Sequence, residues 1–370
     1  MKKMVVIFIT LVFVLNALTA CGNSDRSGML LYEDGQYRDF HLYNLATSID
    51  ILLPGNGYYF DYSVSPDGGT LVGVGCKLIG DEMVSSDDPR LKNLEIDIYH
   101  GSMEPKVIPI PENVLGSLDD HPHNVHITWD TNGKMYLVLT TYNQSILQRY
   151  NVVYEVNGTD FNFIRRVDFP IGSTSNANQG SYGAALEKYI YNPSLWEESY
   201  YIYDSITNQA SKLPITDNTT FPVWTPDMQS ITYFDYGDIQ VCLMTMDTAS
   251  FATKIILCQP QSGSVNGIDQ RWSPDGKYLA FTFQAWDIYT RQSFVIDMNQ
   301  PNMPIVANLK DFGYIGDIYW SPDSKSITFI ANRGEGTSFN LYTMKLGETP
   351  RKIYTSEYWS YDNLPWSYGW

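Results

Sequence analysis

The stretch RWSPDGKYLAF, at residues 271–281, decides how we interpret this chain. It combines the end of one strand, a tight turn and the start of a second strand. Pro274 fixes φ at the second turn position, Asp275 suits the third, and Gly276 can adopt the positive φ that closes a bulged hairpin. The residues after the glycine are aromatic and apolar, as expected of a short buried strand. The stretch therefore predicts a β-hairpin.

The same hairpin recurs along the chain. Clear copies follow Trp224 and Trp320, each 48 residues from Trp272, and weaker copies lie near residues 131 and 185. The proline–aspartate pairs of the four clear copies are Pro66 and Asp67, Pro226 and Asp227, Pro274 and Asp275, and Pro322 and Asp323. A repeat of roughly 40–50 residues with about four short strands is typical of a β-propeller blade.

The two ends of the chain supply one further blade. Residues 29–32, 39–45 and 49–53 have strand character but follow no inner strand, whereas residues 364–370 have the character of an inner strand. Pairing the two ends would remove free sheet edges. We therefore predict an all-β fold, a propeller of four-stranded antiparallel blades closed by its N- and C-terminal strands. Six internal hairpins and the shared blade give seven blades, with six blades as the alternative.

These repeats resemble those of TolB-type propellers, in which the proline–aspartate turn follows Trp-Ser. The resemblance covers residues 25–370 and implies one propeller domain over residues 29–370. The chain departs from TolB because its strands begin almost at once, without an N-terminal α/β domain. The sequence contains no Gly-x-Ser-x-Gly motif, so the nucleophile elbow of the serine hydrolases is absent.

Residues 1–20 have the features of a bacterial signal peptide, with a basic start and an apolar run as far as Leu15. The four residues LTAC at 18–21 resemble a lipobox. This resemblance implies cleavage before Cys21, a lipid on its thiol, and a short tether over residues 21–28. An ordinary secretory cleavage near the same position is the alternative. We expect an exported protein that is anchored to a membrane of the cell envelope and faces outside the cytoplasm.

Charge and cysteine content restrict the choice of partner and compartment. The net charge of −17 argues against nucleic-acid binding, which requires a basic surface. Exported proteins can keep disulfides. Cys242 and Cys258 are placed symmetrically about Ser250 in a predicted hairpin, where they form either a disulfide or two small core residues.

Propellers usually bind ligands on one face, which is formed by the loops between second and third strands and by the connections between blades. The proline–aspartate turns belong to the opposite face, so we interpret their aspartates as structural. Several aromatic and charged residues fall in predicted segments of the loop-rich face, where they suit a peptide or a glycan. These candidates are Trp196, Asp238, Trp286, Asp287, Arg333 and Glu335.

A histidine-rich segment is the one candidate metal site. Asp120, His121, His123 and His126 fall on the same predicted rim, and imidazole and carboxylate groups are good ligands for divalent metals. Some seven-bladed polysaccharide lyases use a histidine-bound metal on this face. However, the spacing matches no recognised zinc motif. Hydrogen-bonding loop histidines are the alternative interpretation.

Taken together, these features favour a non-enzymatic binding scaffold for a protein, peptide or glycan partner. The protein would need no cofactor, and it would contact the membrane only through the lipid on Cys21. The alternative is a metal-dependent polysaccharide lyase or hydrolase centred on His121 and His123. An acidic substrate would be repelled by the acidic chain, which counts against that alternative.

Overall fold

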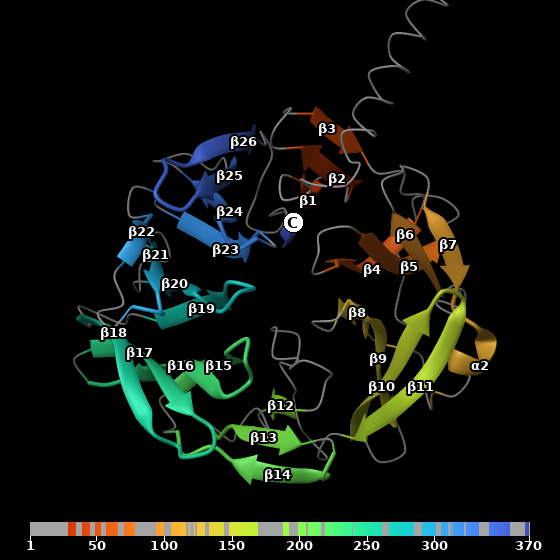
Figure 1. The fold of residues 1–370 in the computed structure, drawn as a ribbon, viewed down its shortest axis with the longest axis horizontal. Coiled ribbons are helices and arrows are strands. Elements are labelled where there is room, and N and C mark those ends of the chain that lie inside the picture. The colour runs from red at the N-terminus through yellow and green to blue at the C-terminus, as the bar shows by residue number, and fades with distance from the viewer. Residues whose placement is uncertain are drawn as a thin grey trace, which may run out of the picture.

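The computed structural model arranges the chain as a ring of antiparallel sheets around a central axis, as Figure 1 shows. The innermost strand of each sheet lies beside the axis and the outermost strand lies on the circumference (Figure 1). The structure describes residues 29–34, 39–44, 49–52, 57–65, 70–77, 94–99, 105–115, 118, 122, 124–129, 133–143, 148–168, 188–191, 199–204, 206–215, 219–238, 240–260, 266–284, 291–300, 305–309, 312, 314–321, 323–332, 340–355 and 367–369.

Five of the sheets contain four strands that follow one another in sequence. They are β4 (Gly57–Val64), β5 (Leu71–Lys77), β6 (Leu94–Tyr99) and β7 (Lys106–Pro109); β8 (Asn124–Trp129), β9 (Met135–Asn143), β10 (Gln148–Asn157) and β11 (Asp160–Asp168); β15 (Thr219–Trp224), β16 (Ser230–Tyr236), β17 (Gln240–Asp247) and β18 (Thr253–Pro260); β19 (Asn266–Trp272), β20 (Tyr278–Gln284), β21 (Arg291–Asp297) and β22 (Ile305–Asn308); and β23 (Tyr314–Trp320), β24 (Ser326–Asn332), β25 (Asn340–Lys345) and β26 (Arg351–Thr355). The short helix α2 (Glu112–Leu115) follows β7.

A sixth four-stranded sheet closes the ring. It contains β1 (Met29–Asp34), β2 (Asp39–Asn44) and β3 (Ile49–Leu52), with β27 (Ser367–Gly369) as its inner strand. β27 pairs antiparallel with β1, with Gly369 opposite Leu31 and Ser367 opposite Tyr32. The predicted closure by pairing of the two ends of the chain is therefore confirmed.

The number of complete blades differs from our first expectation. The remaining sheet has three strands, β12 (Lys188–Tyr191), β13 (Tyr201–Asp204) and β14 (Gln209–Lys212). Six four-stranded blades are found instead of seven, which is the number of the alternative prediction. The inner strand expected for this sheet precedes β12, and residues 169–187 lie outside the described residues.

The proline–aspartate hairpins form as their sequence predicts. In the hairpin between β19 and β20, the Ser273 amide donates to the Tyr278 carbonyl at 2.8 Å, and Gly276 takes a φ of 70°. The Asp275 side chain closes the turn by accepting from the Ser273 hydroxyl at 2.6 Å and from the Lys277 amide at 3.0 Å. A short polar residue, proline and glycine thus each meet one requirement of the turn.

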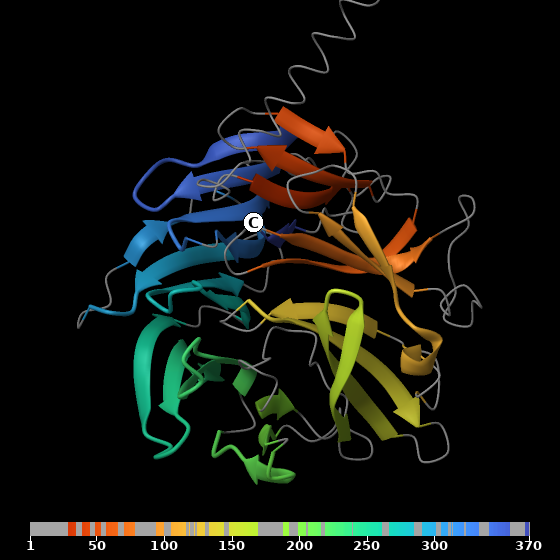
Figure 2. The ribbon, with the colours of Figure 1, turned by 45° about the vertical axis from the view of Figure 1, so that its right-hand side comes forward.

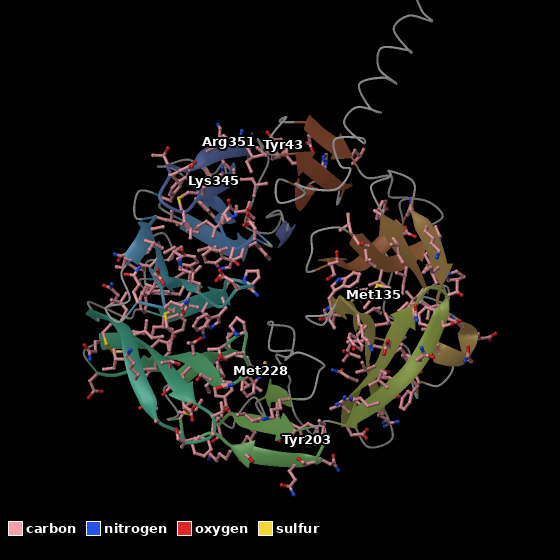
Figure 3. All side chains as sticks on the ribbon, in the orientation of Figure 1. Tyr43, Met135, Tyr203, Met228, Lys345 and Arg351 are labelled. Carbon is pink, nitrogen blue, oxygen red and sulfur yellow. A yellow bond between two sulfur atoms is a disulfide. The ribbon has the colours of Figure 1, made fainter. Side chains whose placement is uncertain are left out.

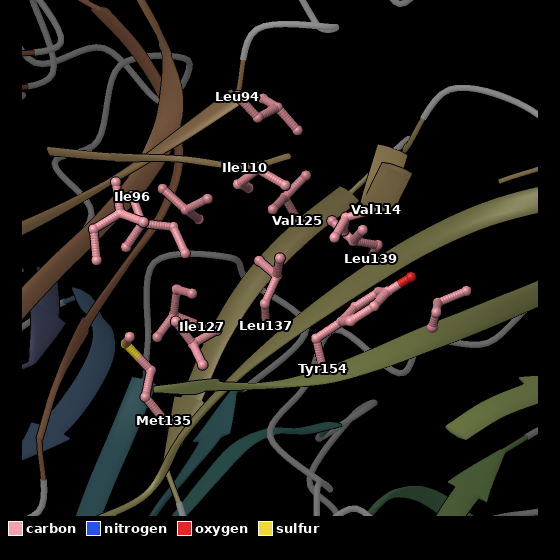
Figure 4. Close-up of a cluster of buried hydrophobic side chains, with 14 of the residues drawn as sticks. Leu94, Ile96, Ile110, Val114, Val125, Ile127, Met135, Leu137, Leu139 and Tyr154 are labelled. Atoms are coloured by element: carbon pink, nitrogen blue, oxygen red, sulfur yellow. The ribbon is translucent and has the colours of Figure 1, made fainter. Parts of the chain in front are cut away.

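The hydrophobic core lies between neighbouring sheets, because each sheet presents one face to the sheet before it and the other to the sheet after it. Figure 4 shows the cluster between the β4–β7 and β8–β11 sheets, where Ile96 and Ile110 meet Ile127 and Leu137. Val114 of α2 packs into the same cluster (Figure 4). Burial of each such side chain contributes roughly 1.5–3 kcal/mol to stability.

The tryptophans of the repeat join one sheet to the next. The Trp320 indole N–H donates to the Arg271 carbonyl at 3.0 Å, and the Trp320 ring stacks on Tyr278 with 5.8 Å between centroids. One sheet earlier, the Trp272 indole donates to the Thr232 hydroxyl at 3.2 Å. Because these tryptophans are 48 residues apart, each inserts its indole ring between its own sheet and the preceding one. We call this contact the tryptophan wedge.

Cys242 and Cys258 lie directly opposite each other on β17 and β18 and form a disulfide, with Cα atoms 4.1 Å apart. The structure therefore supports the first of the two alternatives that the sequence left open. The bond ties an outermost strand to its neighbour at the edge of the sheet.

Within the part of the chain that the structure describes, no helix has both the length and the apolar character needed to span a bilayer.

Candidate functional site

We call the two ends of the ring the loop-rich face and the turn face. The loop-rich face carries the loops between second and third strands and the connections between sheets. The turn face carries the turns between first and second strands and those between third and fourth strands, and Figure 2 shows the ring from an oblique direction. The strands alternate in direction, so every inner strand runs from the loop-rich face towards the turn face.

Four of the inner strands share an irregularity near the middle of their length. β4, β15, β19 and β23 each have a shift of register against their second strand, at Tyr59/Asp61, Thr220/Val223, Gly267/Asp269 and Ile315/Ile318. A β-bulge of this kind turns side chains away from the regular alternation and often lies beside a binding site. The bulges form a partial ring around the axis.

Acidic residues occur at one repeated position of this ring. Asp269 and Asp317 lie three residues before Trp272 and Trp320, and Asp61 lies three residues before Val64, which has the corresponding register in β4. Asp61 and Asp269 follow their bulges directly, opposite Val74 and Thr282, and Asp317 lies within the shift between Ile315 and Ile318. Three of the bulged inner strands therefore carry an aspartate at the bulge. We name Asp61, Asp269 and Asp317 the inner aspartates.

The inner aspartates are not among the site residues predicted from the sequence. The signal was nevertheless present, because Asp-Gln-Arg-Trp at 269–272 and Asp-Ile-Tyr-Trp at 317–320 repeat the same spacing. What the sequence alone could not supply was the bulge beside them, since register shifts depend on the neighbouring strand.

Two of the predicted site residues are described by the structure, and they lie apart in the fold. His126 is a half-buried residue of the inner strand β8, opposite Val138 of β9. Asp238 is exposed in the β16–β17 loop, where the Gly237 amide donates to the Gln240 carbonyl at 2.9 Å. The remaining candidates lie outside the described residues: Cys21, Asp120, His121, His123, Trp196, Trp286, Asp287, Arg333 and Glu335.

The proposed metal ligands cannot be assembled from the described residues. His126 is the one member of the set Asp120, His121, His123 and His126 that the structure describes. Among the residues that the structure describes, no three histidine, cysteine or acidic side chains come together as a metal site. No catalytic step is assigned to these residues.

The aspartates of the repeat turns make contacts within their own hairpins. Asp227 accepts from the Thr225 hydroxyl at 2.6 Å, and Asp323 accepts from the Ser321 hydroxyl at 2.6 Å, as Asp275 does from Ser273. Burial alone would raise the pKa of Asp275, but its hydrogen bonds with Ser273, the Lys277 amide and Ser324 lower that pKa below its ordinary value. These contacts stabilise the ionised carboxylate. Pro66, Asp67 and Pro322 lie outside the described residues, whereas Pro226 and Pro274 are exposed in their turns.

Side-chain contacts also hold the inner strand β19 to the sheets on either side of it. The Gln270 side chain is buried and donates to the Thr232 carbonyl of the preceding sheet at 2.9 Å. Arg271 points to the other side, with its guanidinium carbon 5.7 Å from the centroid of the Tyr319 ring. Such contacts fix β19 relative to its neighbouring sheets, which suits a rigid binding surface better than one that closes around its ligand.

Comparison with solved structures shows the fold of this chain. An oligogalacturonate lyase in complex with manganese is 14% identical, with 86% of each chain covered and a TM-score of 0.57. The β-propeller domain of the Trilobed protease from Pyrococcus furiosus is 12% identical over 88% of this chain and 93% of that one, with a TM-score of 0.55. A TolB from Acinetobacter baumannii also matches, at 14% identity over 84% of this chain and 73% of that one, with a TM-score of 0.42.

The first two similarities establish the β-propeller fold alone, because identities of 14% and 12% are far below the range in which function is shared. No protein-family model and no curated protein sequence matches the chain.

Proposed function

We propose that this protein is a lipid-anchored, extracytoplasmic β-propeller that binds a partner on its loop-rich face without catalysing a reaction. Among the partners that a propeller face can bind, the inner aspartates favour a basic peptide or a basic segment of a protein. An anionic glycan would be repelled by the same residues and by the net charge of −17.

The observation that carries the binding proposal is the repeated sequence position of Asp61, Asp269 and Asp317 at the bulges of three inner strands. Strands in a closed ring hold the backbone of these positions at fixed separations. A ligand with several positive charges could therefore meet several carboxylates without the protein reorganising, which lowers the entropic cost of binding. The contacts of Gln270 and Trp272 with Thr232 support this rigidity.

The anchoring proposal depends on the lipobox-like residues at 18–21. The full-length protein should be recovered from membranes, with a diacylglyceryl group on Cys21 in its intact mass. The Cys21→Ser variant should lose this group and leave the membrane fraction. A membrane-extracted protein without lipid at Cys21 would contradict the anchoring.

The binding proposal can be tested with a lysine-rich peptide as the probe. The triple variant Asp61→Asn, Asp269→Asn, Asp317→Asn should bind the peptide much more weakly than the unchanged protein at low ionic strength. The matched control changes three exposed acids elsewhere, Glu112→Gln, Asp160→Asn and Glu348→Gln, and alters the net charge equally. Equal weakening in both triple variants would show a general charge effect and contradict a site at the inner aspartates.

The alternative function is a metal-dependent polysaccharide lyase or hydrolase. One observation favours it, the similarity at a TM-score of 0.57 to an oligogalacturonate lyase solved with manganese. Its candidate ligands are Asp120, His121, His123 and His126. Stoichiometric manganese in the purified protein that is lost in the double variant His121→Ala, His123→Ala, together with cleavage of a uronate glycan, would establish this function instead.

A further inference from the structure

Two outer turns of the turn face have the same backbone. In the turn between β13 and β14, the Asp204 carboxylate accepts from the amides of Ile206 and Thr207, each at 2.9 Å. The fourth turn residue, Asn208, takes a φ of 57° and accepts a hydrogen bond from the Tyr203 hydroxyl. Tyr203 is labelled in Figure 3. Asparagine is a common choice at this left-handed position, and here its side chain is also held in place.

The turn between β17 and β18 repeats this arrangement one sheet later. The Asp247 carboxylate accepts from the amides of Ala249 and Ser250, at 3.2 and 2.7 Å. The fourth turn residue is Phe251, which has the same φ of 57°. A left-handed conformation is unfavourable for a bulky side chain and is well tolerated by glycine or asparagine. The sequence therefore retains an aromatic residue where the backbone disfavours one.

Both turns also expose a large apolar side chain to solvent. Ile206 is 65% exposed, Phe251 is 42% exposed, and Ile255 on the adjoining strand β18 is 52% exposed. None of the three belongs to the buried core of the described residues, so the core does not account for the strained position of Phe251. Backbone strain and exposed apolar side chains both tend to occur at functional sites, so the strained, exposed Phe251 indicates a contact outside the fold.

The start of the propeller lies on this same face. β1 is the second strand of its sheet and runs from the turn face towards the loop-rich face, so Met29 is on the turn face. Eight residues, 21–28, separate it from the start of the mature chain at Cys21. Even fully extended, they reach only about 28 Å. A lipid on Cys21 would therefore hold the turn face close to the membrane.

We propose that the turn face lies against the lipid bilayer, with Ile206 and Phe251 entering its interfacial region. This inference rests on the proposed anchoring through Cys21. Exposed aromatic and aliphatic side chains on protruding turns suit the boundary between headgroups and acyl chains. Ile206 and Phe251 lie on turns of separate sheets. Separate apolar side chains can each enter a bilayer, whereas a protein partner is usually bound by one continuous apolar surface, so this arrangement favours a bilayer.

Charge on the turn face limits the kind of lipid. Its inner turns expose Asp227, Asp275 and Asp323 but also carry Lys277 and Lys325, so they offer an anionic surface no net electrostatic attraction. The contact should therefore be apolar and should form with vesicles of phosphatidylcholine alone. It leaves the loop-rich face directed away from the membrane, where a soluble partner can reach it.

The test measures how fast a bulky, membrane-impermeant maleimide reacts with single cysteines, using a Cys76→Ser background. Ala249→Cys places the thiol at the exposed tip of the β17–β18 turn, and Asn162→Cys places the control thiol on exposed β11 at the circumference. Each lipidated protein is inserted into preformed phosphatidylcholine vesicles. The reference is the same variant with Cys21→Ser, free in solution beside identical vesicles.

We expect the thiol at 249 to react several-fold more slowly on the vesicles than in the reference, and the thiol at 162 to react equally fast in both. Adding Phe251→Asn should restore fast reaction at 249. Equal rates at 249 with and without the lipid anchor would overturn the proposal. Protection in native membranes but not in lipid vesicles would also overturn it, and would indicate a protein partner. Absence of lipid on Cys21 would instead contradict the proposed function.

Discussion

The turn face carries two sets of tight turns whose side chains do different things. The polar residues of the inner turns form hydrogen bonds within their own hairpins and also with the neighbouring sheet. For example, the Asp275 amide in the turn after Trp272 donates to the Ser324 hydroxyl in the turn after Trp320 at 3.0 Å. The outer turns at 205–208 and 248–251 satisfy their own backbones and expose Ile206 and Phe251. The comparison suggests that the inner turns hold the ring together and that the outer turns are available for contact with another surface.

The largest effect is expected from the tryptophan wedge. Trp320→Ala removes the stacking on Tyr278 and the hydrogen bond to the Arg271 carbonyl, and it leaves a cavity between two sheets. We expect the free energy of unfolding to fall by about 3–5 kcal/mol, measured by urea denaturation. Phe163→Ala is the control, because Phe163 is 60% exposed on β11. An equal loss of unfolding free energy in the control would contradict a particular stabilising role for the tryptophan contacts between sheets.

A smaller loss is expected from the polar part of an inner turn. Asp323→Ala removes the acceptor for the Ser321 hydroxyl at 2.6 Å and for the Lys325 amide at 3.1 Å. Because the carboxylate is partly exposed, we expect a loss of about 1 kcal/mol in thermal or urea unfolding. Asp160→Asn, at the exposed first residue of β11, should change stability much less. Equal losses would contradict a structural role for the repeat aspartates.

A backbone change at an inner turn should cost a similar amount. Gly276 has a φ of 70°, and a Cβ added there would lie 3.7 Å from Pro226, at ordinary contact distance. Gly276→Ala therefore tests backbone strain with little steric interference, and the expected loss is about 1 kcal/mol. Gly276→Asn should lose less, because asparagine tolerates this conformation. A neutral Gly276→Ala would show that the turn relaxes freely.

The hydrogen bonds of Asp275 also predict a dependence on pH. Since the pKa of Asp275 is lower in the folded protein than in the unfolded chain, its contribution is present above the unfolded value of 3.8 and is lost as the pH falls through the folded value. The difference in unfolding free energy between the protein and its Asp275→Asn variant should therefore shrink below about pH 4. A difference that stays constant down to pH 2.5 would contradict this assignment.

Much of the fold could be predicted from sequence because a propeller repeats one local unit. The spacing of Trp224, Trp272 and Trp320 gave the repeat, and the strand character at both ends gave the closure that β1 and β27 confirm. The predicted number of complete blades was wrong by one. The sheet β12-β13-β14 has the weakest copy of the hairpin motif, so its residues offered the least information.

The candidate site was much less predictable. The site residues predicted from the sequence belong to loops, and most of them lie outside the described residues. The inner aspartates lie within strands, where their significance depends on bulges formed with the neighbouring strand. Phe251 gives no signal in the sequence either, because only the backbone reveals its left-handed conformation.

The most direct test of the comparison is the free energy of unfolding of the Phe251→Asn variant in solution. Asn208 shows that asparagine fits the same turn in the neighbouring sheet. If Phe251 is retained for contact outside the fold, the variant should be more stable than the unchanged protein by about 0.5–1 kcal/mol. A loss of stability would show instead that the Phe251 ring supports the ring of blades, and would contradict the division between inner and outer turns.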